Sequence, residues 1–187
     1  MLAHKRQSFI IVVSSILLIG LFALTWYQFK REARIIINKV IIEDVIQLKT
    51  IFDTINQECG ILNFDHDRNY IDFLTVKSFV SSEVGSMNLE HPEKWGGPYV
   101  QDNPTMQSKK YEIVRTKSGY YIVPGAGVQL SQGKIMGRDV VITPQTNMKL
   151  LMSKKGSLWY EGKPLCARVT TRSDKSPSIS RQVDPEF

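Results

Sequence analysis

An uninterrupted apolar run near the N-terminus places the strongest constraint on how this chain can fold. Every residue from Phe9 to Tyr27 is apolar, small or aromatic, except three uncharged polar residues, Ser14, Ser15 and Thr25. At about 1.5 Å per residue, a helix over this range is about 28 Å long. The hydrocarbon core of a bilayer is about 30 Å thick. The run therefore predicts a transmembrane helix over residues 9–27.

The flanks of the run indicate a retained anchor. Residues 1–8 form a short basic leader. The apolar run is longer than the core of a cleaved secretory signal, and Trp26 and Tyr27 end it where an interfacial aromatic belt is expected. Lys5 and Arg6 favour a cytoplasmic N-terminus, whereas Lys30, Arg31 and Arg34 favour the reverse orientation.

The same helix is predicted to continue as an amphipathic helix as far as Gly60, because the first proline in the chain is Pro92. Apolar residues three or four apart form one stripe among charged residues. That stripe either packs only on the chain's own domain or also contacts copies of the chain. Gly60 is a suitable left-handed residue to follow the helix end. The stripe consists of Ile37, Ile41, Val45, Leu48, Phe52 and Ile55.

The remainder predicts a small antiparallel β region, so the expected fold class is α+β: a long N-terminal helix, transmembrane and then amphipathic, packed on a small sheet. Residues 61–104 are expected to form a connector with a short helix at 71–84, residues 105–171 the β region, and residues 172–187 a disordered tail. Glycine turns separate the candidate strands. These strands are Tyr111–Thr116, Gly119–Val123, Gly127–Leu130, Asp139–Ile142, Met148–Ser153, Ser157–Tyr160 and Pro164–Thr170.

Charge is unevenly distributed along the chain, whose net charge is +6. Residues 104–175 contain thirteen Lys and Arg against four Asp and Glu, a net of +9. A basic face beside an anchor can rest on anionic headgroups. Nucleic acid is compatible with the charge, but no reading motif accompanies it, so we expect no nucleic-acid partner. The two cysteines, Cys59 and Cys166, are either joined by a disulfide or are two isolated buried thiols.

No recognisable catalytic, metal-binding or cofactor motif occurs in the sequence, which lacks GxSxG, a P-loop, GxGxxG and HExxH. Asp65-His66-Asp67 is interpreted as a solvated loop, because three consecutive residues cannot converge on a metal without partners. We therefore expect no enzyme activity, no metal and no cofactor.

The arrangement of leader, apolar run beginning with Phe, extended helix, connector and small sheet resembles the type IV pilin and pseudopilin superfamily. The string Lys94-Trp95-Gly96-Gly97-Pro98-Tyr99 resembles the D-P-W-G-N-P-Y turn of the major pseudopilins of type II secretion. The resemblance covers residues 5–142. It implies a bacterial inner-membrane protein whose helices stack into a short fibre and whose sheet decorates the outside.

Three departures from the family pattern are visible. Ser8 stands where the family has a glycine before the processing site, so cleavage between Ser8 and Phe9 is in question. Val13 occupies the fifth position counted from Phe9, where the family carries a glutamate that pairs with a neighbour's N-terminal amine. The C-terminal region is basic where some members have an acidic calcium loop, so no calcium is expected.

The leading hypothesis is a pseudopilin-like structural subunit of a type II secretion or type IV pilus-like assembly. Its partners would be the membrane, other pilin-like subunits and inner-membrane secretion components, in a homo- or hetero-oligomer with a periplasmic domain. Helix packing is expected at Phe9, Val13, Ile16 and Gly20. A structural turn that fixes the sheet against the helix is expected at Trp95, Gly96, Gly97, Pro98 and Tyr99. The alternative is a single-pass anchored module whose basic β domain binds a ligand, lipid or polymer without forming a fibre.

Overall fold

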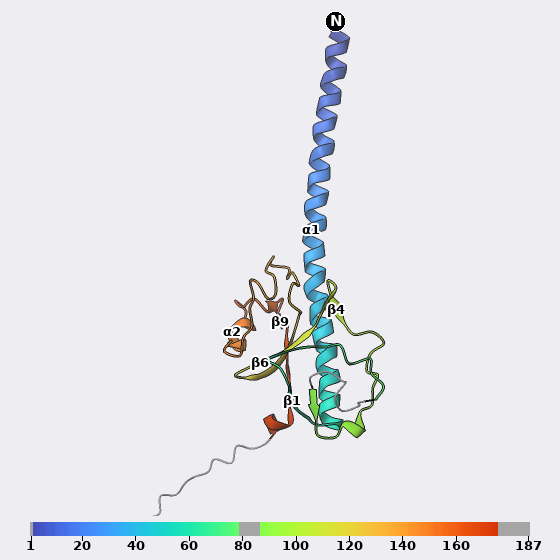
Figure 1. The fold of residues 1–187 in the computed structure, drawn as a ribbon. Helices are drawn as coiled ribbons and strands as arrows, with labels where there is room; N and C mark the ends of the chain where they lie inside the picture. Colours follow the sequence, from blue (N-terminus) through green and yellow to red (C-terminus); the bar gives the residue numbers. More distant parts are fainter. Residues whose placement is uncertain (1, 79–86, 176–187) are drawn as a thin grey trace, which may run out of the picture.

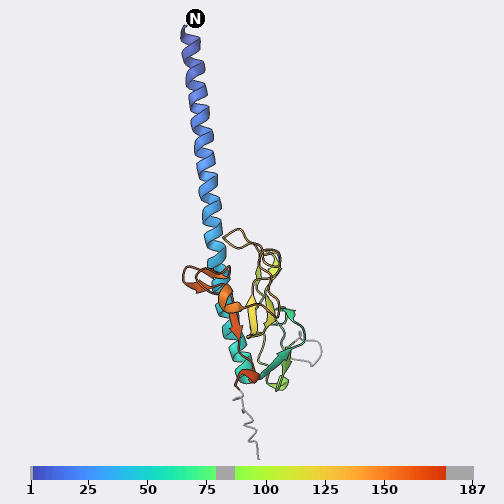
Figure 2. The ribbon, with the colours of Figure 1, turned by 90° about the vertical axis from the view of Figure 1, so that its left-hand side faces the viewer.

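The protein is one long helix with a head of short strands packed around its C-terminal half (Figure 1). The structure, a computed structural model, describes residues 2–78 and 87–175. The helix, α1, spans Leu2–Glu58 without a break. It therefore includes most of the segment expected to be a separate leader. Figure 2 shows that the first half of α1 stands clear of the head in a second view.

Helix α1 ends as the sequence predicts. The amide groups of Cys59 and Gly60 donate to the carbonyl oxygens of Ile55 and Asn56, and Gly60 has φ +68°. The side chain of Asn56 then accepts a hydrogen bond from the amide of Ile61, at 2.9 Å. Because only glycine adopts this left-handed backbone without strain, Gly60 allows the chain to reverse directly into the first strand.

The head contains one four-stranded antiparallel sheet, in the order β10-β7-β6-β2. Its strands are β2 (Arg68–Tyr70), β6 (Glu112–Thr116), β7 (Gly119–Val123) and β10 (Ala167–Val169). Strands β6 and β7 form the predicted hairpin, with Thr116 opposite Gly119. Both β7 and β10 contact α1 directly.

Three two-stranded pairs and three short helices complete the described head. The pairs are β1 (Ile61–Phe64) with β3 (Met87–Leu89), β4 (Thr105–Met106) with β5 (Lys109–Lys110), and β8 (Trp159–Tyr160) with β9 (Lys163–Pro164). The short helices are η1 (Pro92–Lys94), α2 (Met148–Leu151) and η2 (Arg172–Lys175). The expected class is confirmed: an α+β fold with an N-terminal apolar helix and small antiparallel sheets.

The core lies between α1 and the sheet. Ile41, Val45, Leu48, Phe52 and Ile55 of the predicted stripe are buried, and Ile37 is half-buried where the head begins. Phe52 meets Phe64 and Phe73 edge-on, with ring centroids 6.4 and 6.2 Å apart. The periodicity thus identified the face of α1 on which the head packs.

Several local predictions are wrong. Residues 148–151 form helix α2 rather than a strand, in keeping with the good helix propensity of Met, Lys and Leu. The predicted strands at 127–130 and 139–142 contribute only isolated bridges, Gln129 with Ile135 and Met136 with Val140. Residues 71–78 contain turns and no helix. The first four residues of the predicted disordered tail, Arg172–Lys175, form helix η2 instead. The rest of the predicted helix, 79–84, and the rest of the predicted tail, 176–187, lie outside the described residues.

Candidate functional site

The described side chains in the N-terminal half of α1 include large apolar ones around the whole circumference of the helix. Between Val13 and Phe29, eleven large apolar or aromatic side chains are 40–70% exposed. Burying each would gain about 1.5–3 kcal/mol, so together they represent about 15–30 kcal/mol. A patch of this size marks a membrane or protein interface. The window Val13–Lys30 is long and apolar enough to cross a membrane.

Aromatic contacts mark the end of this apolar segment. Phe22 and Trp26 stack one helical turn apart, with ring centroids 6.4 Å apart. The Nζ of Lys30 lies over the Trp26 ring, 5.5 Å from its centroid. A lysine that packs its stem on an aromatic ring and keeps its charge at the boundary suits a membrane interface.

The residues expected to pack helices share one face of α1. Val13, Ile16 and Gly20 follow one another at helical spacings of three and four, which places them on one side. Val13 and Ile16 are exposed, and no atom outside its own helix turn lies within 4 Å of a Cβ placed on Gly20. Small residues let helix backbones approach closely in a membrane. The structure describes the backbone of Phe9 but not its side chain.

Polar contacts fasten the head to the C-terminal half of α1. Asn38 is fully buried where the helix enters the head: its side chain donates to the Ser131 hydroxyl and accepts from the Ser131 amide, at 3.2 Å. One turn and a half further on, the hydroxyl of buried Tyr111 donates to Asp44 at 2.7 Å. Burial raises the pKa of both Tyr111 and Asp44, so the tyrosine remains a neutral donor.

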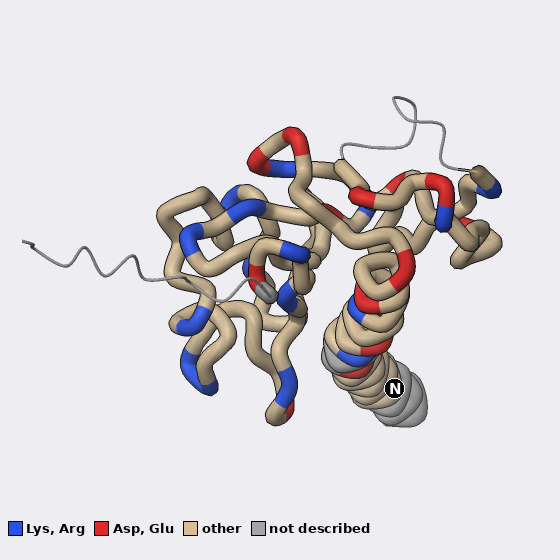
Figure 3. The backbone as a smooth tube through the Cα atoms, turned by 90° about the horizontal axis from the view of Figure 1, so that it is seen from below, with Lys and Arg blue, Asp and Glu red and all other residues tan. Residues whose placement is uncertain are grey.

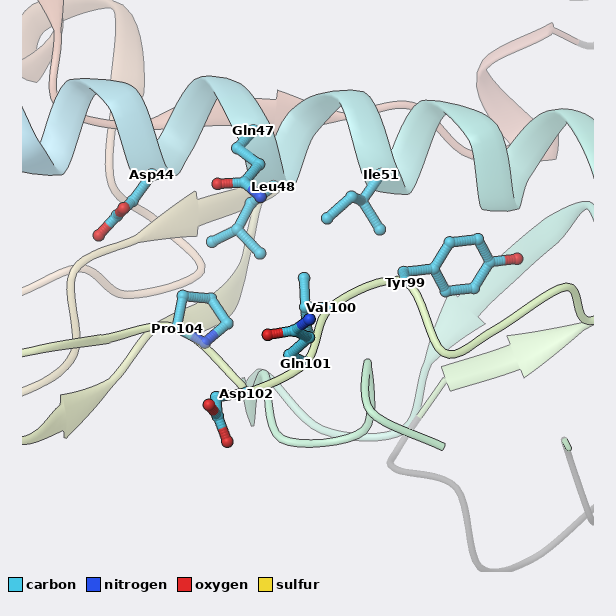
Figure 4. A pocket seen from close by; sticks show the side chains of 9 residues that line it. All are labelled: Asp44, Gln47, Leu48, Ile51, Tyr99, Val100, Gln101, Asp102 and Pro104. Carbon is cyan, nitrogen blue, oxygen red and sulfur yellow. The ribbon is translucent and has the colours of Figure 1, made fainter. Parts of the chain in front are cut away.

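A groove of about 310 Å³ runs between α1 and residues 99–104 beside this contact (Figure 4). Asp44, Gln47, Leu48 and Ile51 face it from the helix, and the segment from Tyr99 to Pro104 forms the other side. The groove carries two carboxylates, Asp44 and Asp102, and no histidine, cysteine, serine or lysine is among its described lining residues. Its lining gives no indication of catalysis.

The predicted turn at Trp95–Tyr99 is tightly built. The indole Nε1 of Trp95 donates to the carbonyl oxygen of Val76 at 2.9 Å, and the ring meets Tyr99 edge-on at 4.9 Å. The Tyr99 amide donates to the Leu74 carbonyl at 2.8 Å. A Cβ on Gly97 would lie 2.5 Å from both Trp95 Nε1 and the Val76 oxygen. Any side chain at Gly97 would therefore break the indole hydrogen bond.

This turn fixes the connector rather than the sheet. Its hydrogen bonds reach Leu74 and Val76, and a Cβ on Gly96 would touch the Glu58 side chain at the end of α1. The four-stranded sheet reaches α1 directly through β7 and β10. The expectation that the turn fixes the sheet against the helix is therefore corrected. Gly96 adds a bond of its own, from its amide to the Tyr99 hydroxyl at 3.2 Å.

The two cysteines are buried free thiols, so the disulfide between Cys59 and Cys166 that the sequence left open is not formed. Burial raises the pKa of Cys166 from 9.0 to about 12. The pKa of Cys59 is also raised, first by burial and then by the nearby charges of Glu58 and Glu93. Thiols that stay protonated are poor nucleophiles and poor metal ligands.

An ion pair between a buried glutamate and a partly exposed arginine is the feature that sequence reasoning missed. Glu112 lies in strand β6 and is only 1% exposed, although it is a charged residue. Its carboxylate accepts from the guanidinium of Arg68 and from the amide of Ala126, at 2.9 Å, and Arg68 also donates to the Ile142 carbonyl. A sequence-based pattern of alternating polar and apolar residues would place the charged Glu112 on the solvent-exposed face of the sheet. The pairing of β2 with β6 brings Arg68 beside Glu112.

Within residues 2–78 and 87–175, no group of three His, Cys, Asp or Glu is arranged to hold a metal ion. His66 lies exposed in the loop between β1 and β2, and its amide donates to the Asn69 side chain. Comparison of the chain with protein-family models, with curated proteins and with solved structures gives no match.

Proposed function

We propose that this protein is a pseudopilin-like structural subunit, anchored by one helix in a bacterial inner membrane, of a type II secretion or type IV pilus-like assembly. One observation carries the proposal. A single unbroken helix of 57 residues presents apolar side chains on all sides between Val13 and Phe29 and holds an α+β head on its second half. A subunit of this shape can stack its helices while its heads face outward.

Further support comes from one face of the exposed N-terminal half of α1 and from the turn at Trp95–Tyr99. Val13, Ile16 and Gly20 offer a face with one small residue where a neighbouring helix can approach. The string from Trp95 to Tyr99 resembles the family turn, and Trp95, Gly97 and Tyr99 make close contacts in it. With Val13 in place of the family's glutamate, assembly would rely on packing rather than on a buried charge pair.

A cysteine placed at Ile19 tests the stacking. Ile19 is 69% exposed, whereas the two native cysteines are fully buried, so an introduced thiol would be the accessible one. In native membranes, oxidation of Ile19→Cys should give crosslinked copies that resist detergent. The unmodified chain and Gln145→Cys, whose cysteine lies exposed on the head, serve as controls. A monomer with no crosslink and no copurifying subunit would refute the proposal.

Processing and orientation need separate measurements. The intact mass of the membrane-extracted protein would show whether the segment before Phe9 has been removed. The proposed periplasmic head requires the cytoplasmic side to hold Lys5 and Arg6 rather than Lys30, Arg31 and Arg34. Labelling of Gln145→Cys by a membrane-impermeant maleimide from the periplasm would support this orientation. Labelling only from the cytoplasmic side would contradict it.

The second candidate, an anchored binding module that forms no fibre, is favoured by the basic charge of the head. Figure 3 views the protein roughly along the helix. Most of the blue Lys and Arg segments lie there in the part of the head to the left of α1. Absence of Ile19→Cys crosslinks together with ligand binding by the head would favour this candidate over the first.

A further inference from the structure

A wide groove of about 680 Å³ lies on the head near the C-terminal end of α1. The β6–β7 hairpin, from Arg115 to Tyr121, contributes the longest stretch of its lining. Leu62 and Asn63 of β1, Lys149 of α2, and a segment from Arg168 to Asp174 form the rest. Four of the lining residues are cations, Arg115, Lys117, Lys149 and Arg168, and one is an acid, Asp174, for a net charge of +3.

The cations differ in how firmly they are held. Arg168 donates to Asp174 Oδ1 at 2.5 Å, and Asp174 Oδ2 also accepts from the Thr171 amide at 3.1 Å. Arg115 is 4.0 Å from Asp67, with both side chains about 60% exposed, so that pair contributes little. Lys117 and Lys149 are exposed and form no ion pair with any residue that the structure describes. The groove therefore has positive charge available for a ligand.

The hairpin turn adds hydroxyl groups and a fixed guanidinium. The Thr116 hydroxyl donates to the Gly119 carbonyl at 2.9 Å, and Ser118 pairs with the Tyr121 hydroxyl at 3.0 Å. Gly119 has φ +110°, and a Cβ there would lie 3.0 Å from Arg168 Nε. Glycine thus lets Arg168 lie over the turn. A fixed guanidinium among hydroxyls suits carboxylate or phosphate groups, which it can bind in a bidentate manner.

Lipid headgroups are too far away to be this ligand. The wall of Thr171–Asp174 lies at the end of α1: Arg172 pairs with Glu90 at 2.6 Å, and the Glu90 amide donates to the Gly60 carbonyl. From Lys30 to Gly60 the helix axis rises about 45 Å. A typical tilt of about 20° shortens this only slightly, and charges are screened over about 8 Å. The expectation that the basic face rests on headgroups does not fit this groove.

The aromatic rings argue against nucleic acid. Single strands are bound by stacking bases on free aromatic faces. Tyr121 is only 6% exposed, and the ring of Tyr120 packs on Phe64 with centroids 4.9 Å apart. Helix α2, which carries Lys149, has four residues and is too short to read a major groove. A flexible chain that bears carboxylates fits the lining better.

We propose that this groove is a binding site for an acidic polypeptide segment of a partner protein, whose carboxylates would contact Arg115, Lys117, Lys149 and Arg168. The site is independent of helix stacking, so it would serve either candidate function. In a fibre it would give each head a docking point about 45 Å along α1 from the end of the apolar segment. In an anchored module it would be the ligand site.

The test is binding of fluorescent oligoglutamate to the full chain in uncharged lipid nanodiscs. We expect saturable binding at physiological salt that weakens at high salt. Lys117→Glu with Lys149→Glu should weaken it at least about tenfold. Lys154→Glu with Lys155→Glu is the matched control, since both residues are exposed, lie outside the groove lining and change the net charge equally. This control should change the affinity less than about twofold.

Several results would overturn the proposal. Equal losses in the two double variants would mean that oligoglutamate responds to net charge alone. Tighter binding of an oligodeoxythymidylate of equal charge would indicate a nucleic-acid site instead. Displacement of oligoglutamate by phosphatidylglycerol vesicles, but not by unlabelled oligoglutamate, would indicate a lipid site. Because all four lysines are exposed, unchanged thermal unfolding of both variants is expected and confirms that the comparison is between folded proteins. Ile19→Cys crosslinking reports on stacking separately.

Discussion

The two halves of α1 have the same backbone and opposite environments. In the first half Phe22 is 70% exposed, and in the second Phe52 is 1% exposed. In the second half one stripe is apolar and the opposite face carries residues such as Glu43 and Thr50. In the first half, the stretch from Val13 to Phe29 contains no charged side chain and exposes large apolar ones. The helix is continuous although only its second half packs on the head. The pattern of side chains in each half decides whether that half suits water or an apolar environment.

The largest expected effect separates the two halves directly. Phe52→Ala removes a ring packed between Phe64 and Phe73 and should lower the free energy of unfolding of the head by about 3–5 kcal/mol. Phe22→Ala makes the same chemical change in the exposed half and should leave head unfolding unchanged. Denaturant unfolding in detergent, followed by tryptophan fluorescence, measures both. Equal destabilisation by the two variants would contradict the division.

A charge in the first half should affect membrane insertion instead. Leu18→Arg places a cation near the middle of the apolar segment, which costs about 2.5–3.5 kcal/mol of insertion free energy. The variant should move partly to the soluble or degraded fraction, as measured by membrane fractionation after carbonate extraction. Thr50→Arg, on the exposed face of the second half, is the control. Full membrane retention of Leu18→Arg would argue that this half does not cross a bilayer.

Two glycines provide a smaller contrast of the same kind. Gly97→Ala would break the bond between Trp95 Nε1 and the Val76 carbonyl and should cost about 1–3 kcal/mol of head stability. Gly20→Ala meets no neighbouring atom and should not lower head stability. If Gly20 lies in a packing seam, Gly20→Leu should reduce Ile19→Cys crosslinks. Unfolding of the head by Gly20→Ala would contradict this picture.

The smallest effect is a fall in the stability of the head at alkaline pH, which comes from a thiol buried in the head. The pKa of Cys166 is about 12 in the folded protein against 9.0 ordinarily, so the folded state keeps a proton that the unfolded state releases. The associated stability is fully present below pH 9 and is lost as pH rises toward 12, by about 1 kcal/mol per pH unit. Cys166→Ala should flatten the fall in stability between pH 9 and 10. An unchanged slope would mean that the thiol is solvated.

Short-range patterns in the sequence predicted much of the fold. Helical periodicity identified Ile41, Val45, Leu48, Phe52 and Ile55 as the packed stripe, and a glycine at residue 60 correctly marked the end of α1. The hairpin around Lys117-Ser118 was also predictable. The helix at residues 148–151 was not predicted: Met, Lys and Leu favour a helix, but a segment of four residues is too short for periodicity to distinguish a helix from a strand.

The sequence by itself determined that the segment from Phe9 to Tyr27 needs an apolar environment, because no polar face accompanies side chains such as Leu18 and Phe22. It also determined where the helix ends, because a backbone reversal at Gly60 needs a residue without a Cβ. Only the tertiary structure decided that Glu112 is buried against Arg68, and that Arg115, Lys149 and Arg168 surround one groove. Those residues are distant in sequence. The pairing of β2, β6, β7 and β10 and the packing of α2 bring them together, through contacts that no local pattern encodes.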